Sequence, residues 1–295
     1  MIVVTAATGN IGKTLVEDLL AKKQKVLALA RDEKKLAPLA RKGAETRRLD
    51  LSDATAVTEA FKGAQAVFLL IPPRYNAPDF RAHYNDVSRV YVDAVRNAGI
   101  KHVVNLSSLG AHLPESTGPI KGLHDHEKRL DGLSRVHRLH LRPAYFMENA
   151  FFSLGLIKNQ GINGSPIAPD IRFPMIATRD IAERAAQALT NRNFEGCSVL
   201  ELHGQRDLTL KEVTGILGAA IGKPNLSYIQ FPYNDAYKAM VSGGMSPDVA
   251  NLFNEMYRGF NEGTITPTQP RTSETTTETS IEAFSEIFSA AYNRL

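Results

Sequence analysis

Two glycines follow a short apolar run near the start of the chain. Gly9 and Gly12 lie in "VVTAATGNIGKTLVEDLL", where the apolar run gives way to a helical pattern. Their spacing is that of the second and third glycines of a G-x-x-G-x-x-G turn, with Ala6 in place of the first. In such a turn, backbone N–H groups approach a pyrophosphate at the N-terminus of the helix. The segment predicts a nucleotide-binding turn, provided that Ala6 adopts a negative φ; an ordinary glycine-containing turn has the same pattern.

A basic pair follows the next apolar run. Arg31, in "LALARDEKK", lies 19 residues after Gly12, where a site for NAD usually has a carboxylate for the ribose 2′-hydroxyl. The planar donors of an arginine suit a 2′-phosphate instead, and Lys35 adds a charge one helical turn later. This pattern favours NADP(H) over NAD(H). The alternative is a solvated cluster, because Asp32 and Glu33 lie in the same stretch.

Asp50 is a third candidate, in "RRLDLSD" directly after an expected strand. Its carboxylate suits the adenine amine. It also suits a helix cap, a role that Ser52 or Asp53 would serve equally well.

These residues lie in a chain whose first half alternates short apolar runs with helical patterns. "MIVVTAA", "KVLALAR", "AVFLLIPP" and "HVVNLSS" predict strands, and the segments between them predict helices. This alternation indicates a mainly parallel sheet with helices on both faces. After about Asn149 the pattern becomes mixed and mostly helical, with a helical pair broken at Gly243 and Gly244. The segment "TPTQPRTSETTTETS" predicts an exposed polar connector before a closing helix.

Composition narrows the functional classes. The 295 residues carry 35 basic and 31 acidic side chains, a net charge of +4, and no long basic run, so nucleic-acid binding is not required. Cys197 is the single cysteine, which excludes an internal disulfide framework. No apolar stretch is long enough to span a bilayer. We expect a cytoplasmic globular protein, monomeric or homodimeric, with no direct nucleic-acid or membrane partner.

Six motifs in order resemble one family. "VTAATGNIG", "ALARDEKK", "RRLDLSD", "VRNAGIKHVVNLSS", "LRPAYFMEN" and "RDIAERAAQAL" are similar to the NmrA-like branch of the atypical short-chain dehydrogenases/reductases, as is "GMSPDVANLFNEMYRGFNEG". The resemblance implies an α/β fold: a Rossmann-like, doubly wound parallel sheet that carries NADP, with a smaller, mostly helical C-terminal substrate domain. We expect the first domain to span residues 1–149, joined by elements of 176–205, and the second to span 150–295.

The resemblance also implies roles for individual positions. The pyrophosphate would lie against Ala7, Thr8, Gly9, Asn10, Ile11 and Gly12, and the 2′-phosphate against Arg31 and Lys35. Asp50 and Leu51 would lie near the adenine, Ile71, Pro72 and Pro73 along the adenosine and ribose, and Phe146 and Met147 near the nicotinamide. Lys128 would hold the ribose hydroxyls.

The catalytic residues depart from the wider superfamily. Its members pair a tyrosine with a lysine four residues later and a serine at a strand end. This chain has Lys128 and, among its strand-end serines, Ser108, but His124 replaces the tyrosine. His124 or His126 could donate a proton, or each could be a surface histidine; Tyr145 could donate from another wall or lie in the core. No metal site is predicted, because "HDH" with Glu127 lacks a zinc spacing.

Two functions are therefore compatible with the sequence. The first is an NADPH-dependent reductase that delivers hydride to a quinone-like or otherwise conjugated small molecule, which needs mainly a dry cleft that stacks cofactor and acceptor. The second is a catalytically silent redox sensor that binds NADP(H) and regulates a protein partner. A deep open pocket over the nicotinamide would favour the enzyme, and a filled one the sensor.

Overall fold

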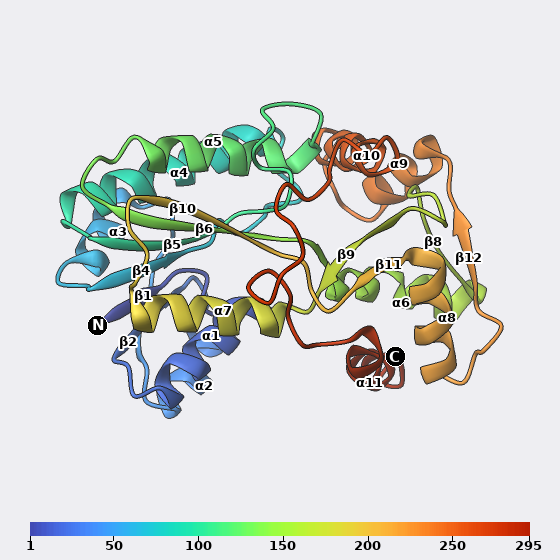
Figure 1. Ribbon diagram of the computed structural model, residues 1–295, viewed down its shortest axis with the longest axis horizontal. Coiled ribbons are helices and arrows are strands. Elements are labelled where there is room, and N and C mark those ends of the chain that lie inside the picture. Colours follow the sequence, from blue (N-terminus) through green and yellow to red (C-terminus); the bar gives the residue numbers. More distant parts are fainter.

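A sheet of seven parallel strands forms the first part of the structure, a computed structural model that describes residues 1–295 (Figure 1). The strand order is β10-β6-β5-β4-β1-β2-β3, so the order reverses between β1 and β4, where α/β sheets of this kind bind ligands. The strands are β1 (Ile2–Val4), β2 (Val26–Ala30), β3 (Glu45–Arg48), β4 (Ala66–Leu69), β5 (His102–Leu106), β6 (His137–Pro143) and β10 (Cys197–Leu202). β1, β2 and β4 are buried along their whole length, which explains their continuous apolar sequences.

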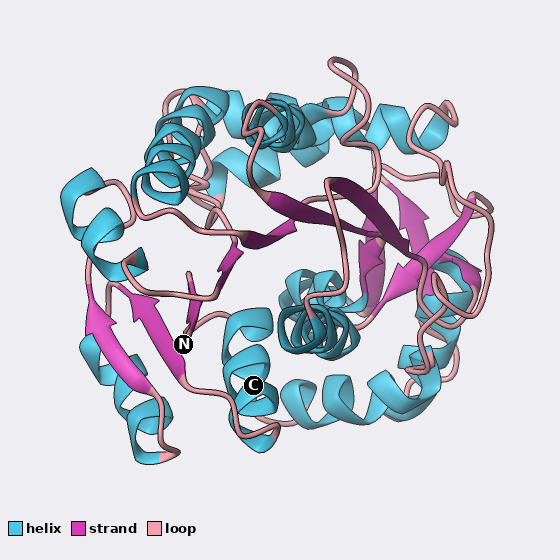
Figure 2. Ribbon diagram, turned by 60° about the vertical axis from the view of Figure 1, so that its left-hand side comes forward, coloured by secondary structure: helices cyan, strands magenta, loops and turns pink.

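Helices cover both faces of this sheet (Figure 2). One face carries α1 (Asn10–Ala21), α2 (Glu33–Arg41) and α7 (Thr178–Asn191), and the other carries α3 (Ala54–Phe61), α4 (Phe80–Asn97) and α5 (Lys121–Asp131). The face with α3 and α4 has an apolar core of 24 buried residues, and the face with α1 and α7 shares a core of 48 buried residues with the C-terminal half of the chain. The predicted Rossmann-like, doubly wound α/β fold is confirmed. None of the helices combines the length and the apolar character that a membrane crossing requires.

The second part of the structure contains two small sheets and five helices. One sheet holds β7 (Tyr145–Phe146), β9 (Arg172–Ile176) and β11 (Asp207–Thr209), and the other holds β8 (Ile162–Ser165) and β12 (Ser227–Gln230). The helices are α6 (Leu154–Gln160), α8 (Leu210–Ala220), α9 (Tyr233–Ser242), α10 (Pro247–Asn261) and α11 (Ile281–Tyr292), and two short 3-10 helices are η1 (Gly118–Ile120) and η2 (Met147–Ser153). The break at Gly243 and Gly244 separates α9 from α10 as predicted. The sequence indicated few of these strands, because two to five residues carry little periodicity.

The chain crosses between the two parts more than once. After β9 it returns to the first part, where α7 packs on α1 and β10 pairs with β6. The segment between α10 and α11 then runs across the molecule; residues 266–268 and 270–274 are exposed, as predicted, but three threonines near its end are not. Thr275, Thr277 and Thr279 are buried rather than exposed. A buried threonine hydroxyl needs a hydrogen-bond partner. Thr279 has one, because its backbone N–H and its hydroxyl both donate to the Asp180 carboxylate of α7.

Candidate functional site

The turn between β1 and α1 has the geometry of an anion site. A Cβ on Gly12 would lie 2.4 Å from the Ala6 carbonyl oxygen and 2.8 Å from the Ala7 Cα, so this glycine is required for helix–strand packing. A Cβ on Gly9 would meet nothing closer than 3.6 Å, so the fold leaves its outer side open. The first-turn N–H groups of α1 have no carbonyl partner within the helix, and no acidic residue lies in that turn. These groups fit a pyrophosphate.

Ala6 differs from the sequence-based expectation. Its φ is +50°, in the left-handed region, whereas the sequence argument required a negative φ. An L-residue in this region costs about 1–2 kcal/mol relative to the right-handed region. Position 6 therefore has the left-handed backbone conformation that glycine adopts most readily, and Ala6 is strained there.

A cavity of about 600 Å³ opens beside this turn, and we call it the glycine-turn cavity. Ten of the residues expected to contact a dinucleotide line it: Thr8, Gly9, Asn10, Ile11, Arg31, Lys35, Leu51, Pro72, Pro73 and Phe146. Most come from the loops that follow β1, β2, β3 and β4; Asn10 and Ile11 begin α1, Lys35 lies in α2, and Phe146 ends β7. The structure thus gathers at one sheet edge residues that are up to 138 positions apart in the sequence, counted from Thr8 to Phe146.

A smaller hollow of about 260 Å³ shares Arg31, Leu51, Pro72 and Pro73 with the glycine-turn cavity. Asp50 lines it, and hydrogen bonds from the Ser52 backbone and hydroxyl lower the pKa of that carboxyl. Asp53, not Asp50, caps α3 through the Ala56 N–H.

Two arginines that the sequence argument missed lie near the Arg31 side chain. Arg48 lines a shallow hollow together with Arg31 and donates from Nε to the Arg31 carbonyl oxygen at 3.2 Å. Arg74 lines the hollow around Asp50. Both are exposed, so the end of the cavity near Arg31 is more basic than Arg31 and Lys35 alone would make it.

Six residues predicted near the dinucleotide do not line the glycine-turn cavity: Asp50, which lines the smaller hollow, Lys128 of α5, and Ala7, Gly12, Ile71 and Met147. Ala7 is fully buried and its N–H donates to the Leu29 carbonyl oxygen at 3.0 Å. Gly12 packs against the turn, and Ile71 belongs to the core around α3 and α4. Met147 is 3% exposed and lines a separate small cavity.

Ser108, His124 and Lys128 do not line the glycine-turn cavity. The Ser108 hydroxyl donates to the Leu109 carbonyl oxygen at 3.0 Å, and His124 Nδ1 lies 2.8 Å from the Ala111 carbonyl oxygen. Lys128 is exposed because α5 buries His126 against α4, and residue 128 lies about 200° further around the helix. The structure does not bring these three side chains together at a cavity.

His126 cannot serve as a proton donor to a ligand. It is fully buried, and Nδ1 lies 2.8 Å from the Ser88 hydroxyl of α4. Burial, together with the nearby His140 and Arg129, lowers its pKa to about 3, so it is neutral near pH 7. It is a core residue of the α4–α5 interface.

Metal-ligand types gather elsewhere, beyond the predicted "HDH" stretch. Asp131, His140 and Cys197 place one ligand atom each within 4.8 Å of one another. The same Asp131 oxygen that faces His140 and Cys197 also accepts from Arg138 Nε at 2.9 Å, which supplies a positive charge there.

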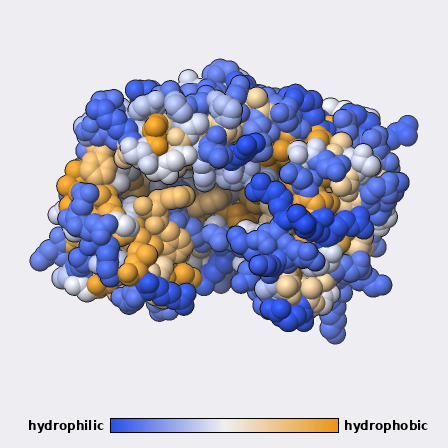
Figure 3. Space-filling model, turned by 180° about the vertical axis from the view of Figure 1, so that it is seen from behind, coloured by the Kyte–Doolittle hydropathy of each residue, from blue (hydrophilic) through white to orange (hydrophobic).

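A second large cavity, of about 560 Å³, adjoins the first, and we call it the aromatic cavity. It lies between η2, α9 and α10, and none of its 19 lining residues is charged. Its walls are aromatic and methionine side chains: Tyr75, Tyr145, Phe152, Phe231, Phe253, Tyr257, Met240, Met245 and Met256. Seen from behind, the surface is hollowed across the middle, with apolar residues lining the hollow (Figure 3).

Three residues line both large cavities: Tyr75, Asn149 and Phe152. Phe152 is 71% exposed, an unusual state for a phenylalanine at a cavity mouth. A ligand that passes from one cavity to the other would contact all three.

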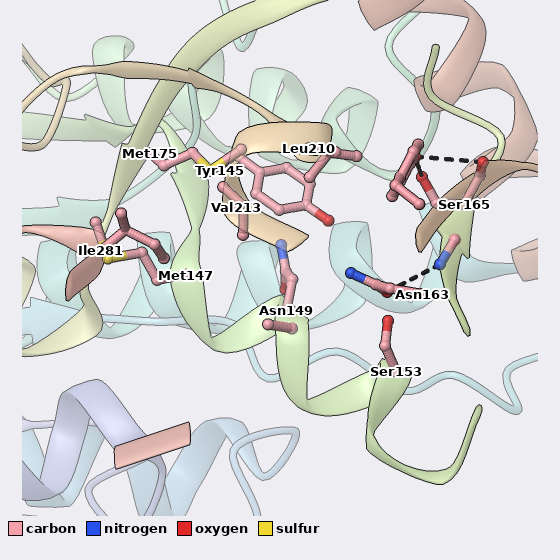
Figure 4. Close-up of a pocket in the computed structure, with 13 residues that line it drawn as sticks. Tyr145, Met147, Asn149, Ser153, Asn163, Ser165, Met175, Leu210, Val213 and Ile281 are labelled. Carbon is pink, nitrogen blue, oxygen red and sulfur yellow. Dashed lines mark hydrogen bonds between the residues drawn. The ribbon is translucent and has the colours of Figure 1, made fainter. Parts of the chain in front are cut away.

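A small side cavity of about 40 Å³ extends from the aromatic cavity (Figure 4). Tyr145, Asn149, Ser153, Gly164 and Ser165 line both. Figure 4 shows the Tyr145 hydroxyl turned toward the space between Asn149, Asn163 and Ser165. Burial and Tyr228 raise the pKa of Tyr145, opposed in part by the neighbouring Asn149 side chain, so the hydroxyl is protonated near pH 7.

Glu148 was missed by the sequence argument, although it lies within the motif "YFMEN". It lines the glycine-turn cavity, and its carboxylate accepts from the Thr178 backbone N–H at 2.9 Å, at the start of α7. Burial raises the pKa of Glu148, while the hydrogen bonds from Thr178 oppose the rise. It fixes η2 to α7 and thereby the cavity wall that carries Phe146.

This chain is similar to known proteins over most of its length. A family model described as the NmrA-like family matches residues 1–287. A NAD(P)H azoreductase of Xenophilus azovorans is 29% identical over 259 residues, covering 87% of this chain and 86% of the relative. Quinone oxidoreductase 2 of Escherichia coli is 26% identical over 272 residues, covering 90% of each.

Solved structures share the fold. The NADPH-dependent quinone oxidoreductase of Escherichia coli, complexed with NADPH, superimposes with a TM-score of 0.80 at 24% identity and covers 97% of this chain and 99% of its own. The Citrobacter triphenylmethane reductase, complexed with NADP(H), gives 0.82 at 22% identity, with 98% and 100% covered.

Proposed function

We propose that this chain, which belongs to the NmrA-like family, is an NADPH-dependent reductase of quinone-like or other conjugated small molecules. The observation that carries the proposal is the junction of two cavities at Tyr75, Asn149 and Phe152. One cavity has the glycine turn and the basic side chains of a dinucleotide site. The other is uncharged, apolar and large enough for a flat aromatic molecule. The similarity to an azoreductase and a quinone oxidoreductase supports this function.

In this proposal, the glycine-turn cavity holds the cofactor. The α1 N-terminus and Gly9 would bind the pyrophosphate, Arg31 and Lys35 the 2′-phosphate, and Phe146 would lie near the nicotinamide. NADPH, when bound, supplies the hydride. Residues 1–149, with elements of 176–205, would carry the cofactor, and the rest of 150–295 would cover the acceptor.

The aromatic cavity would select the acceptor. Its apolar walls offer faces on which a planar ring can stack, so the acceptor would be held against the nicotinamide end of the other cavity. Because no charged side chain lines this cavity, it offers no carboxylate or lysine to stabilise a localised charge. It therefore suits acceptors that delocalise the incoming electron pair.

Ser108, His124 and Lys128 are not assigned a part in this mechanism. Their positions away from both cavities give no support to the catalytic roles predicted from the sequence. Those roles stay a prediction that substitution of each residue can test.

The open aromatic cavity also favours an enzyme over a redox sensor. A silent sensor would need no acceptor site, and a filled space over the nicotinamide would be expected. A volume of about 560 Å³ at this position supports turnover of a small molecule.

The test is the consumption of NADPH by the purified protein with duroquinone, an azo dye and malachite green, with NADH in parallel. Turnover of at least one acceptor with NADPH, and much slower turnover with NADH, is expected. Binding of NADPH without consumption of any acceptor would contradict the reductase proposal and favour the sensor, for which co-purifying protein partners would be the next measurement.

A further inference from the structure

The aromatic cavity has a polar end and an apolar mouth. Its polar side chains, Asn149, Ser153 and Ser165, gather where the side cavity begins, and Met240, Met245 and Met256 lie along the walls formed by α9 and α10. A conjugated acceptor that carries an oxygen or nitrogen atom would place that atom at the polar end, because an unpaired polar atom is unfavourable against the methionines.

We propose that Tyr145 donates the proton that completes reduction of acceptors whose product gains an O–H or N–H bond, and that Asn149 positions its hydroxyl. This inference rests on the proposed function, and it names the proton source for that reaction. No carboxyl, histidine or lysine lines the aromatic cavity, so the proton must come from a hydroxyl or from water.

Three tyrosines line the aromatic cavity, and their positions distinguish them. Tyr145 alone also lines the side cavity, at the polar end. Its ring is fixed by edge-to-face contacts with Phe173 and Phe260, at centroid distances of 5.3 and 6.1 Å. Tyr75 lies at the junction with the glycine-turn cavity, and Tyr257 lies among the aromatic walls.

Asn149 connects Tyr145 to the reacting region. It lines the glycine-turn cavity, the aromatic cavity and the side cavity, and its side chain lies beside the Tyr145 hydroxyl (Figure 4). By contrast, Ser165 is already paired with the Tyr228 hydroxyl at 2.7 Å. The Tyr145 ring is held by Phe173 and Phe260, and its hydroxyl faces the space where the two cavities meet, so its proton is available to a ligand.

The chemical balance defines which acceptors need this proton. When a quinone takes up a hydride, the hydrogen forms a bond to one oxygen and the electron pair leaves the other oxygen negatively charged. The Tyr145 O–H bond would break as that oxygen forms its new O–H bond, and water would return a proton to the phenolate. A cationic triarylmethane dye needs no such step, because the hydride forms a C–H bond at its central carbon and yields a neutral product.

The first test exploits this difference with the variant Tyr145→Phe, which keeps the ring. We expect kcat for duroquinone to fall roughly 10- to 100-fold, while kcat for malachite green stays within about twofold. Tyr237→Phe, which removes a hydroxyl from α9 outside the cavity lining, should change neither rate. Equal slowing of both acceptors, or no change in either, would overturn the assignment, as would a duroquinone-selective loss in Tyr75→Phe or Tyr257→Phe.

A binding measurement tests the contact without turnover. Isothermal titration of duroquinone in the absence of cofactor should show binding weakened roughly fivefold in Tyr145→Phe, the loss expected for one net hydrogen bond. Durene, the hydrocarbon of the same shape, should bind both proteins equally. Full methylation of duroquinone prevents addition by the exposed Cys197 thiol.

The two tests separate failure of the inference from failure of the proposed function. If the wild-type protein reduces neither acceptor, the reductase proposal fails, and the titration alone decides whether Tyr145 contacts the oxygen. If duroquinone and durene respond alike to Tyr145→Phe, the hydroxyl makes no such contact and the inference is wrong.

Discussion

The glycine-turn cavity and the aromatic cavity are almost equal in volume, at about 600 and 560 Å³, but they are built in different ways. Most of the first comes from the loops after four successive strands, and Arg31 and Lys35 give it positive charge. The second is assembled from the loop after β4, β7 to β8, and α9 and α10, and carries no charged residue. A phosphate-bearing ligand requires particular residues at fixed backbone positions, whereas a flat apolar ligand requires only a surface of the right shape.

The largest expected effect is a loss of stability where the segment between α10 and α11 is bound to β10. Glu201 of β10 is fully buried and accepts hydrogen bonds from the backbone N–H groups of Thr268 and Gln269, in the segment between α10 and α11. Burial opposes ionisation, but the bonds from His203, Thr268 and Gln269 outweigh it and lower the pKa of Glu201 to about 2. Glu201→Gln should lower the free energy of unfolding by about 3 kcal/mol at pH 7.

The pH dependence of this loss follows from the sign of the shift. Because the folded pKa lies below the unfolded value, the carboxylate contributes its full stability above about pH 4.5 and loses it as pH falls toward 2. Urea unfolding of wild type and Glu201→Gln at pH 7 and at pH 4 or below measures this loss. The difference in the free energy of unfolding between the two proteins should be smaller at the lower pH. A difference that is small at pH 7 or independent of pH would contradict this role.

The two glycines of the turn should behave differently. Gly12→Ala places a Cβ 2.4 Å from the Ala6 carbonyl oxygen, and we expect the free energy of unfolding to fall by about 2 kcal/mol. Gly9→Ala, where the nearest atom is 3.6 Å away, should change stability by less than about 1 kcal/mol but weaken NADPH binding. Urea unfolding and cofactor titration of both variants measure the contrast; equal loss of stability in the two would remove the reason to assign Gly9 to a ligand.

Arg31→Ala should weaken NADPH binding roughly 20-fold, because it removes charge-assisted hydrogen bonds to the 2′-phosphate. NADH binding should change little, since NADH lacks that phosphate. Arg47→Ala, one strand away and outside the cavity lining, is the matched control. Titration of both cofactors against both variants decides the point, and a parallel loss of NADH affinity would place the 2′-phosphate elsewhere.

Ala236→Phe should act on the aromatic cavity alone. Ala236 lies on α9, which buries no residue, so the added ring should narrow the cavity with little effect on stability. We expect KM for duroquinone to rise roughly tenfold with NADPH binding unchanged. Lys238→Phe, on the same helix but outside the lining, is the control in steady-state assays. An unchanged KM would argue that the acceptor binds elsewhere.

The smallest expected effect is at Ala6. Ala6→Gly relieves a φ of +50° but makes the unfolded chain more flexible, so a net gain of about 0.5 kcal/mol is expected. Ala7→Gly, at a neighbouring buried position without positive φ, should instead destabilise the protein. Thermal unfolding of the pair distinguishes the two, and destabilisation by both would mean that Ala6 is not strained.

These contrasts explain how much the sequence could predict. Gly9, Arg31 and Lys35 were predicted from the spacing of a nucleotide turn and of the residues after the next strand, and Pro72 from the family resemblance; all four line the glycine-turn cavity. Lys128 lines neither large cavity, and its position could not be predicted because spacing within a helix does not say which face the helix buries; here His126 lies on the buried face.

The aromatic cavity could not be predicted in the same way. Tyr75 and Met256 are 181 positions apart and share a wall only because α10 returns to the loop after β4, where the Ser246 N–H donates to the Tyr75 carbonyl oxygen. The polar connector was predicted exposed because its composition is polar; Thr279 near its end is nevertheless buried, because Asp180 of α7 accepts its hydrogen bonds.

The most direct test of the account is a crystal structure of the protein with NADP⁺ and duroquinone bound together. The account predicts the pyrophosphate at the N-terminus of α1, the 2′-phosphate against Arg31, and duroquinone in the aromatic cavity, in contact with the nicotinamide beside Asn149. Duroquinone bound outside the aromatic cavity, or separated from the nicotinamide by protein side chains, would contradict it.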